Sequence, residues 1–369
     1  MNSSPVSVTH ALGSYPVYVE PSSTARLPEL LSRHLPDRRL VMLVDENVAA
    51  LYRSGRWGAA QWKGETLTFA AGEQSKTRET WTQLTDTLLE RGFGRDTGII
   101  ALGGGVTGDL AGFVAATYMR GVPYLQVPTT LLAMLDASVG GKTGVDTIRG
   151  KNLVGAFHPP AAVIADPLTL HTLPEREYRA GLAEAVKHGL IADEDYFGWI
   201  ETRAAELLKR EPAALTWLIH RSVEIKAEVV SQDERETGRR AILNAGHTVG
   251  HALEQVTGYQ LPHGEAVALG LVVESRLAEQ LGIGDPGLSR RLAQLLVRLG
   301  LPDRLPSDID GNVLIGSMMA DKKNRAGQIR FALPSGIGRI GRSGEWTTTA
   351  SERAIRRALE AAPGNLNPL

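Results

Sequence analysis

The 369-residue chain has no cysteine, which excludes disulfides and thiolate metal sites. Its net charge is −1 at pH 7, so nothing indicates a nucleic-acid or polyanion surface. No apolar run approaches the length of a membrane span, and the stretch 266–273 is far too short. The N-terminal residues lack a charged segment followed by an apolar core, the mark of a secretory signal. We therefore expect a cytoplasmic protein with no membrane or nucleic-acid partner.

Lysine is also scarce, with nine residues against thirty-one arginines. Six of the nine lie in polar or glycine-rich motifs: Lys142, Lys151, Lys187, Lys226, Lys322 and Lys323. Chance retention is the simplest explanation, but the coincidence with Gly, Asn, Glu and His argues against it. The planar fork of arginine does not replace a compact ammonium group. The pattern indicates a site for an anionic substrate, one that binds phosphate.

The length allows two domains, each with its own core. Short apolar runs predict buried parallel strands at 39–44, 98–102, 124–128 and 162–166, with a helix over 77–91. Farther along, stretches rich in Ala, Leu, Glu and Arg predict helices at 177–191, 194–209, 212–234, 240–255, 265–281 and 288–299. A late hairpin strand is predicted at 327–333. We expect an α/β nucleotide-binding domain with a doubly wound, mostly parallel sheet over 1–175, and an all-α metal- and substrate-binding domain over 176–369.

The run GGGVTG at 103–108 follows a predicted strand and satisfies G-x-G-x-x-G. Such glycines let backbone N–H groups approach a pyrophosphate at a helix N-terminus. The pattern alone is weak, because tight turns produce it and no acid follows about 20 residues downstream. Asp45, which ends an earlier strand beside Asn47, is the candidate ribose acid. For Asp109, just after the glycines, we expect a hydrogen bond to a ribose, a nicotinamide or the loop itself.

Three of the nine histidines, His247, His251 and His263, fall within seventeen positions. His247 and His251 are four residues apart, so they share a helix face and could ligate one metal. Core histidines bonded to carbonyls are the alternative, but three of them near glycines favour a metal. Two histidines and a carboxylate suit catalytic Zn²⁺, and the spacing leaves the carboxylate open among Glu184, Glu254 and Glu265. A dinucleotide, a metal and a group of cations together suggest hydride transfer from an alcohol on a phosphorylated acid.

These motifs resemble the 3-dehydroquinate synthase family. The similarity covers about 13–338 and includes GGGVTGDLAGF at 103–113, YMRG at 118–121, PTTLL at 128–132, GGKTG at 140–144, GKNL at 150–153 and the histidine block at 244–263. It implies conversion of 3-deoxy-D-arabino-heptulosonate 7-phosphate to 3-dehydroquinate and phosphate. The implied sequence is transient oxidation by NAD⁺, β-elimination of phosphate, re-reduction and an aldol closure. It also implies a homodimer that uses NAD and Zn²⁺ or Co²⁺.

The resemblance implies roles for individual residues. The implied metal ligands are Glu184, His247 and His263. The implied substrate and catalytic contacts, which include His251 in place of its nomination as a ligand, are Arg120 (from a neighbouring subunit), Asp136, Lys142, Lys151, Asn152, Lys187, Lys226, Arg240, Asn244, His251 and one of Lys322 and Lys323. The implied NAD contacts are Asp45, Asn47, Glu73, Lys76, Gly104, Gly105, Asp109, Thr129, Thr130, Lys142, Lys151 and Thr172. Asp146 and His188 stand where many relatives have Asn and Tyr, and neither is expected to bear the main chemistry.

Three alternatives compete with this interpretation. A cyclase for neutral sugar phosphates, of the 2-epi-5-epi-valiolone or 2-deoxy-scyllo-inosose synthase kind, would lack the full carboxylate-contacting set, whereas Lys226 and Arg240 are present here. An alcohol dehydrogenase of the glycerol dehydrogenase kind would need no lysine cluster and would release NADH. A binding protein without activity would have lost a ligand or a lysine, and none is lost.

Overall fold

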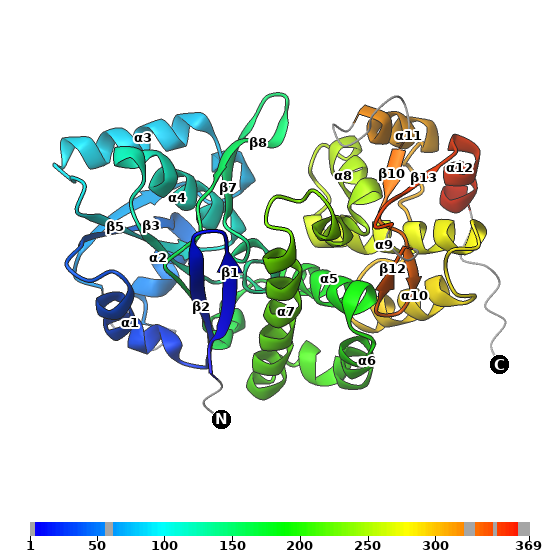
Figure 1. Cartoon of the computed structure of the whole chain (residues 1–369), viewed down its shortest axis with the longest axis horizontal. Helices are drawn as coiled ribbons and strands as arrows, with labels where there is room; N and C mark the ends of the chain where they lie inside the picture. The colour runs from blue at the N-terminus through cyan, green and yellow to red at the C-terminus, as the bar shows by residue number, and fades with distance from the viewer. Residues whose placement is uncertain (1–3, 56–61, 321–328, 342–344, 361–369) are drawn as a thin grey trace. The chain divides into compact units, whose positions relative to one another are not determined.

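The computed structural model describes residues 4–55, 62–320, 329–341 and 345–360. It divides the chain into two compact units (Figure 1). The first comprises Met1–Pro174 and Arg210–Ser231, and the second comprises Glu175–Lys209 and Gln232–Leu369. The division expected at 175/176 stays a prediction. The structure adds that 210–231, most of helix α7 (Pro212–Gln232), groups with the first unit although it follows two helices of the second.

A seven-stranded sheet forms the centre of the first unit, in the order β1-β2-β9-β6-β5-β3-β4. Within it only β1 and β2 pair antiparallel, and the other pairs are parallel. The strands are β1 (Val6–His10), β2 (Gly13–Val19), β3 (Arg39–Asp45), β4 (Glu65–Phe69), β5 (Thr97–Gly103), β6 (Tyr124–Pro128) and β9 (Ala162–Ala165). The predicted doubly wound, mostly parallel sheet is confirmed.

Both faces of this sheet are buried, because alternate residues of each central strand enter different cores. Ile99 and Ala101 of β5 pack with α3 (Arg78–Glu90) and α4 (Gly105–Thr117). Ile100 and Leu102 pack with α1 (Leu27–His34) and α2 (Glu46–Arg53). Burial on both sides explains why β3, β5, β6 and β9 read as continuous apolar runs, and the four predicted strands coincide with them.

An antiparallel hairpin of β7 (Lys142–Thr147) and β8 (Gly150–Phe157), not anticipated from the sequence, lies between β6 and β9 in the chain (Figure 1). It packs on α4 where that helix has no side chain: a Cβ on Gly112 would lie 2.5 Å from Cγ2 of Thr143. The hairpin carries three residues that the sequence nominated for the site: Lys142, Lys151 and Asn152. It is therefore part of the site's framework rather than a surface decoration.

The second unit is mostly helical, as expected. Its helices are α5 (Glu175–Ala192), α6 (Glu194–Leu208), α8 (His247–Val256), α9 (His263–Gln280), α10 (Leu288–Arg298), α11 (Gly311–Ala320) and α12 (Glu352–Glu360). The helix expected over 240–255 is instead the 3₁₀ segment η6 (Arg239–Asn244) followed by α8, because Gly246 takes a left-handed φ of 77°. Within the described residues, no helix combines the length and apolar content that a membrane crossing needs.

Two short ladders refine the expectation of an all-α second domain. β10 (Ile329–Phe331) pairs with β13 (Thr348–Ala350), and β11 (Pro334–Gly336) pairs with β12 (Arg339–Ile340). Ile329, Phe331 and Leu333 alternate into the core made by α8, α9 and α11. The late strand predicted at 327–333 is present over Ile329–Phe331, while 327–328 lie outside the described residues. Alternation along 329–333 buries three side chains against helices.

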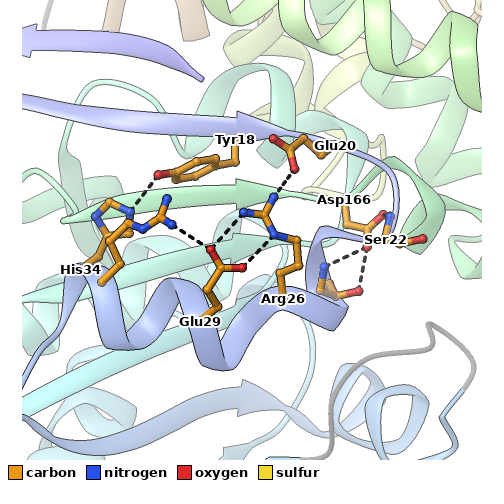
Figure 2. A network of polar contacts seen from close by, with 9 residues as sticks. Tyr18, Glu20, Ser22, Arg26, Glu29, His34 and Asp166 are labelled. Carbon is orange, nitrogen blue, oxygen red and sulfur yellow. Dashed lines mark hydrogen bonds and ion pairs between the residues drawn. The ribbon is translucent and has the colours of Figure 1, made fainter. Parts of the chain in front are cut away.

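A buried carboxylate joins the end of β9 to the segment after β2 (Figure 2). Asp166 accepts hydrogen bonds from Ser22 N (3.0 Å), Thr24 N (3.1 Å) and Thr24 Oγ1 (2.7 Å). It also accepts one from Leu168 N (3.1 Å) and so caps η5 (Pro167–Thr172), which carries Thr172. Backbone donors at two short 3₁₀ segments thus stabilise a charge that is 0% exposed. These hydrogen bonds hold η5 at the end of the sheet where β9 finishes.

Candidate active site

The carboxyl ends of the neighbouring strands β3 and β5 lie side by side. The strand order reverses between them: the chain runs from β3 outward to β4, returns to β5 on the other side of β3, and continues to β6. Open α/β sheets bind ligands at such points. The run 103–108 turns from β5 into α4, with Gly104 as the N-cap residue. A Cβ on Gly104 would lie 2.9 Å from Cγ2 of Thr130, so a larger residue would clash. The bare helix N-terminus is suited to an anion.

Asp45, the predicted ribose acid, ends β3 beside this loop. Its Oδ1 accepts the Val48 N–H (3.0 Å) and caps α2, while Oδ2 accepts the Thr107 hydroxyl (3.3 Å). Thr129 N donates to the carbonyl of Gly103 (2.9 Å) and ties the end of β6 to the same loop. Asp45 and Thr129 are thus both placed at the nucleotide end of the sheet.

Three other predicted NAD positions are either exposed or hydrogen-bonded within their own turn. Asn47 lies in the first turn of α2 and is exposed. Thr130 Oγ1 accepts the Ala133 N–H (3.2 Å), and Thr172 Oγ1 donates to the carbonyl of Thr169 (2.8 Å). Their roles stay predictions.

Lys76 is the centre of a polar cluster in the first unit. It is 4% exposed, and its Nζ donates to Asp109 Oδ2 and to Asn152 Oδ1, both at 2.5 Å. Burial by itself lowers the pKa of Lys76, but the carboxylates of Asp109, Glu73 and Asp146 outweigh it and raise that pKa. Lys76 is therefore a cation at neutral pH. Lys76 is thus the positive partner of Asp109, and this explains why an acid lies so close to the glycine loop.

Three more lysines that the sequence nominated for the site lie in this unit. Lys151 Nζ is 3.6 Å from Glu73 Oε1 at the edge of the cluster. Lys226 of α7 is 5% exposed and donates to the Asp136 carbonyl (2.5 Å) and to its Oδ1 (2.7 Å). Asp136 belongs to the π-helical turn η4 (Ala133–Ala137), an irregularity that is frequent at functional sites. Lys142 is exposed at the start of β7.

Arg120 occupies a strained turn after α4. Met119, Arg120 and Gly121 have φ values of 50°, 69° and 113°, three successive residues in the left-handed region. Non-glycine residues there are unfavourable unless their surroundings impose them, and such strain gathers at functional sites. The turn leaves Arg120 exposed.

Three helices of the second unit bring a carboxylate and two imidazoles together. Glu184 lies in the middle of α5, and His247 and His263 are the first residues of α8 and α9. A glycine permits the close approach: a Cβ on Gly264 would overlap the carbonyl of Ala180 in α5. The start of α9 therefore touches the α5 backbone one turn before Glu184.

The distances in this cluster fit a metal ion better than hydrogen bonds. His247 Nε2 and His263 Nε2 lie 3.7 and 3.6 Å from the same oxygen, Glu184 Oε1. These separations are too long for hydrogen bonds. Ligand atoms at about 2.1 Å from a tetrahedral ion are about 3.4 Å apart, close to the observed values. Two imidazoles and a carboxylate are also a donor set that Zn²⁺ and Co²⁺ accept.

The other nitrogen of each imidazole is held by a partner of its own. His247 Nδ1 is 3.1 Å from the carbonyl of Ala245, and His263 Nδ1 is 3.1 Å from Glu254 Oε2. A bond at Nδ1 fixes the ring and leaves Nε2 as the coordinating atom. This arrangement is the usual second layer of a histidine metal site.

The two imidazoles differ in charge environment. Burial, reinforced by the ammonium of Lys187, lowers the pKa of His247 well below its usual value. Burial also acts against His263, but contacts with Glu184 and Glu254 outweigh it and raise its pKa to about 10. Lys187 itself is 1% exposed and forms an ion pair with Glu184. Two acids and a buried cation thus surround the imidazoles.

The structure also separates the alternatives that spacing left open. Glu265 forms an ion pair with Arg176 (2.6 Å), and Glu254 pairs with His263, which leaves Glu184 as the acid that faces both imidazoles. The ring of His251 is 5.2 Å from that of His247, but within the described residues it groups with Glu254 and His263 rather than with Glu184. Sharing a helix face with His247 was therefore not enough to bring His251 to Glu184.

Segment η6 presents Arg240 and Asn244. Arg240 is 2% exposed, its Nη1 donates to the carbonyl of Glu234 (2.5 Å), and its N–H donates to Asp233 Oδ2 (2.9 Å). Asn244 Nδ2 donates to Glu236 Oε1. The guanidinium is thus held by the loop before η6, in the second unit. The predicted contacts Lys322 and Lys323 lie outside the described residues.

Sequence reasoning missed one of the acids that support these side chains, Glu274. Glu274 is fully buried in α9 and accepts the N–H groups of Gly246 (2.7 Å) and Val249 (3.2 Å), so it anchors the start of α8. A signal for it exists, because a carboxylate within the apolar stretch 266–278 needs partners. Glu254, seven residues after His247 and therefore on the same face of α8, was nominated from the sequence as a possible ligand, and the structure places it against His263 Nδ1.

Two family models and several named relatives match this chain. A family model described as 3-dehydroquinate synthase N-terminal matches residues 66–180, and one described as 3-dehydroquinate synthase C-terminal matches residues 181–324. The 3-dehydroquinate synthase of Symbiobacterium thermophilum is 48% identical over 94% of this chain and 97% of its own length. That of Halorhodospira halophila is also 48% identical, with the same coverage.

Solved structures of sugar-phosphate cyclases share the fold. A 2-deoxy-scyllo-inosose synthase complexed with carbaglucose-6-phosphate, NAD⁺ and Co²⁺ has a TM-score of 0.86 and 27% identity, covering 96% of this chain and 99% of its own. A 2-epi-5-epi-valiolone synthase from Streptomyces hygroscopicus, with NAD⁺ and Zn²⁺ bound, has a TM-score of 0.83 and 30% identity, covering 96% and 98%.

Proposed function

The chain belongs to the 3-dehydroquinate synthase family, and from that premise we propose that it converts 3-deoxy-D-arabino-heptulosonate 7-phosphate to 3-dehydroquinate and phosphate. Elimination of phosphate makes it a lyase. The observation that carries the proposal is the cluster of Glu184, His247 and His263 beside buried Lys187, in a chain nearly half identical to synthases of this name. The sugar-phosphate cyclases of other substrates are more distant, at 27–30% identity.

NAD⁺ and a Zn²⁺ or Co²⁺ ion are the cofactors of the proposed reaction. The glycine run 103–105 and Asp45 would hold the dinucleotide, and Glu184, His247 and His263 would hold the ion. When bound, the dinucleotide takes up and returns a hydride while the ion polarises an alcohol oxygen. Oxidation is temporary, because its use is to acidify the carbon next to the new carbonyl.

The remaining groups bind and orient the substrate. Lys187, buried beside Glu184, is a fixed positive charge for a phosphate or a developing alkoxide. We assign Arg240 to the substrate carboxylate, since its fork is pre-oriented by a carbonyl contact. Lys226, already paired with Asp136, is assigned to the substrate carboxylate and a hydroxyl, and Asp136 is assigned to a ring hydroxyl. Burial of Lys187 and Lys226 excludes water from these charges and so strengthens their pull on a bound anion.

We also propose a cytoplasmic homodimer in which the exposed Arg120 serves the neighbouring subunit. The strained turn supports this, because it holds the side chain away from the subunit's own core. Sedimentation equilibrium tests the dimer. The activity of Arg120→Ala mixed with a variant inactivated at Glu184 tests whether Arg120 serves the neighbouring subunit. Partial activity of the mixture above that of either variant supports sharing, and no gain contradicts it.

The decisive experiment for the reaction follows phosphate release and NADH absorbance together, with catalytic NAD⁺ and Zn²⁺. Many phosphates per enzyme with no net NADH is the expected result. Net NADH without phosphate would instead indicate a dehydrogenase. Turnover of glucose 6-phosphate or sedoheptulose 7-phosphate in preference to the acid would indicate a cyclase for neutral sugar phosphates.

A further inference from the structure

The β7–β8 hairpin (Figure 1) has an irregular register in its outer half. Val145 pairs with Val154 and Thr147 with Gly150, so Asp146 of β7 faces three residues of β8. Extra residues of this kind bend a strand and redirect its side chains, and such bulges are frequent beside active sites. The hairpin is therefore shaped around Asp146.

Asn152 is the middle one of those three residues, and its backbone is left-handed, with φ 54°. That conformation is unfavourable for a residue other than glycine unless neighbouring contacts hold it. Asp146 provides the contact: its Oδ1 accepts the Asn152 N–H at 2.8 Å. The carboxylate thus takes the place of the ladder partner that the bulge removes.

Asp146 also closes a ring of hydrogen bonds. Its own N–H donates to the carbonyl of Lys76 (2.7 Å), the Lys76 ammonium donates to Asn152 Oδ1 (2.5 Å), and the Asn152 N–H returns to Asp146. The same ammonium holds Asp109 at 2.5 Å. Loss of the Asp146 carboxylate opens the ring at the Asn152 N–H, so of the ring's contacts to Asn152 only that of the Lys76 ammonium remains.

The charges near the ring leave Asp146 in a hydrogen-bonding role. Burial raises the pKa of the Asp146 carboxyl and the nearby Glu73 adds to this, whereas the Asn152 N–H and Lys76 act in the opposite direction. Glu73 has its own cation in Lys151, at 3.6 Å. What the Asn152 N–H requires of Asp146 is an acceptor oxygen rather than a full negative charge.

We propose that Asp146 is a positioning residue, which fixes the left-handed turn at Asn152 and so holds the Asn152 amide and the Lys76 ammonium in their functional places. The identity of the ligands that these groups meet rests on the proposed function, and the ring rests on geometry alone. Asn at position 146 can accept the same N–H through Oδ1, and Ala or Leu cannot.

The test compares Asp146→Ala, Asp146→Asn and a matched control, Thr147→Ala. Thr147 also bonds to backbone atoms of the hairpin, at Arg149 N (3.2 Å) and Gly150 O (3.3 Å), but it is outside the ring. We expect Asp146→Ala to weaken NAD⁺ binding or lower kcat/KM by about 10- to 100-fold, the range for a lost charge-assisted hydrogen bond. Asp146→Asn should stay within about threefold of the wild type, as should Thr147→Ala.

NAD⁺ affinity is measured by titration calorimetry, and melting temperature accompanies it. Equal losses in Asp146→Ala and Asp146→Asn, a matching loss in Thr147→Ala, or wild-type values in Asp146→Ala would each overturn the proposal. If Asp146→Ala does not fold, Asp146→Leu, which keeps bulk without an acceptor, takes its place. Weaker NAD⁺ binding in a chain that never releases phosphate would support the ring and refute the proposed reaction. Normal turnover of the wild type, together with wild-type NAD⁺ affinity and kcat/KM in Asp146→Ala, would support the proposed reaction and refute the ring.

Discussion

Removal of Glu254 tests how the proposed metal ligands are held. Glu254 is 4% exposed, and its Oε2 lies 3.1 Å from His263 Nδ1, while the Nε2 of that ring faces Glu184. Without the acid the ring can rotate or change tautomer, and Nε2 is no longer held in the coordinating form. We expect the variant to bind Zn²⁺ more weakly without losing a ligand.

The size of the effect follows from this contact. Partners of this kind are worth about 10- to 100-fold in metal affinity. Glu254→Gln keeps an acceptor oxygen at the same place and loses only the charge, so we expect about 10-fold, or about 1.4 kcal/mol. Glu254→Ala loses the acceptor as well and should approach about 100-fold, or about 2.7 kcal/mol.

Competition with a chromogenic chelator measures the Zn²⁺ affinity, and the visible spectrum of the Co²⁺ form reports the geometry. Glu265→Gln is the matched control, because this acid is two residues from His263 on the same helix but forms an ion pair with Arg176. It should bind Zn²⁺ as the wild type does. If Glu254→Ala also binds Zn²⁺ like the wild type, with an unchanged Co²⁺ spectrum, the orienting role is refuted.

Three further predictions concern other groups. Glu184→Ala should abolish metal retention and turnover together, measured by elemental analysis and phosphate release; retained Zn²⁺ with full turnover would refute the ligand assignment. Arg240→Ala should raise KM more than it lowers kcat, and an unchanged KM would remove it from the substrate carboxylate. Asp166→Ala should lower the free energy of unfolding by about 3–5 kcal/mol in urea, because the buried N–H and hydroxyl donors of Thr24 lose their acceptor; a change below about 1 kcal/mol would contradict this.

The alternation of strands and helices in the first unit was readable because burial on both faces leaves a local trace. β3, β5, β6 and β9 are continuous apolar runs bounded by turn residues. The edge strands β1 and β4, strand β2 next to the edge, and the hairpin β7–β8 were missed. Their faces are only partly buried, so their composition resembles that of loops.

The second unit shows where local patterns mislead. A single helix over 240–255 fits the periodicity, but Gly246 breaks it. Helix α9 approaches there: a Cβ on Gly246 would lie 2.7 Å from Leu271 Cγ and 3.0 Å from the backbone N of Leu271. The break also decides the geometry of the proposed metal site. It makes His247 the first residue of a new helix, and the buried Glu274 holds that helix by its N-terminus.

The sequence by itself determined the parallel sheet, the glycine loop at its switch point and the family, since each rests on short segments with a local pattern. The tertiary structure decided which of three acids joins His247 and His263, and that Asp146 organises Lys76 and Asn152. Glu184 is 63 positions before His247, and Lys76 is 70 before Asp146. Spacing along the chain carries no information at that range. These atoms come within hydrogen-bonding or ligand distance only because glycines let the helices pack closely and a bulge bends the β7–β8 hairpin.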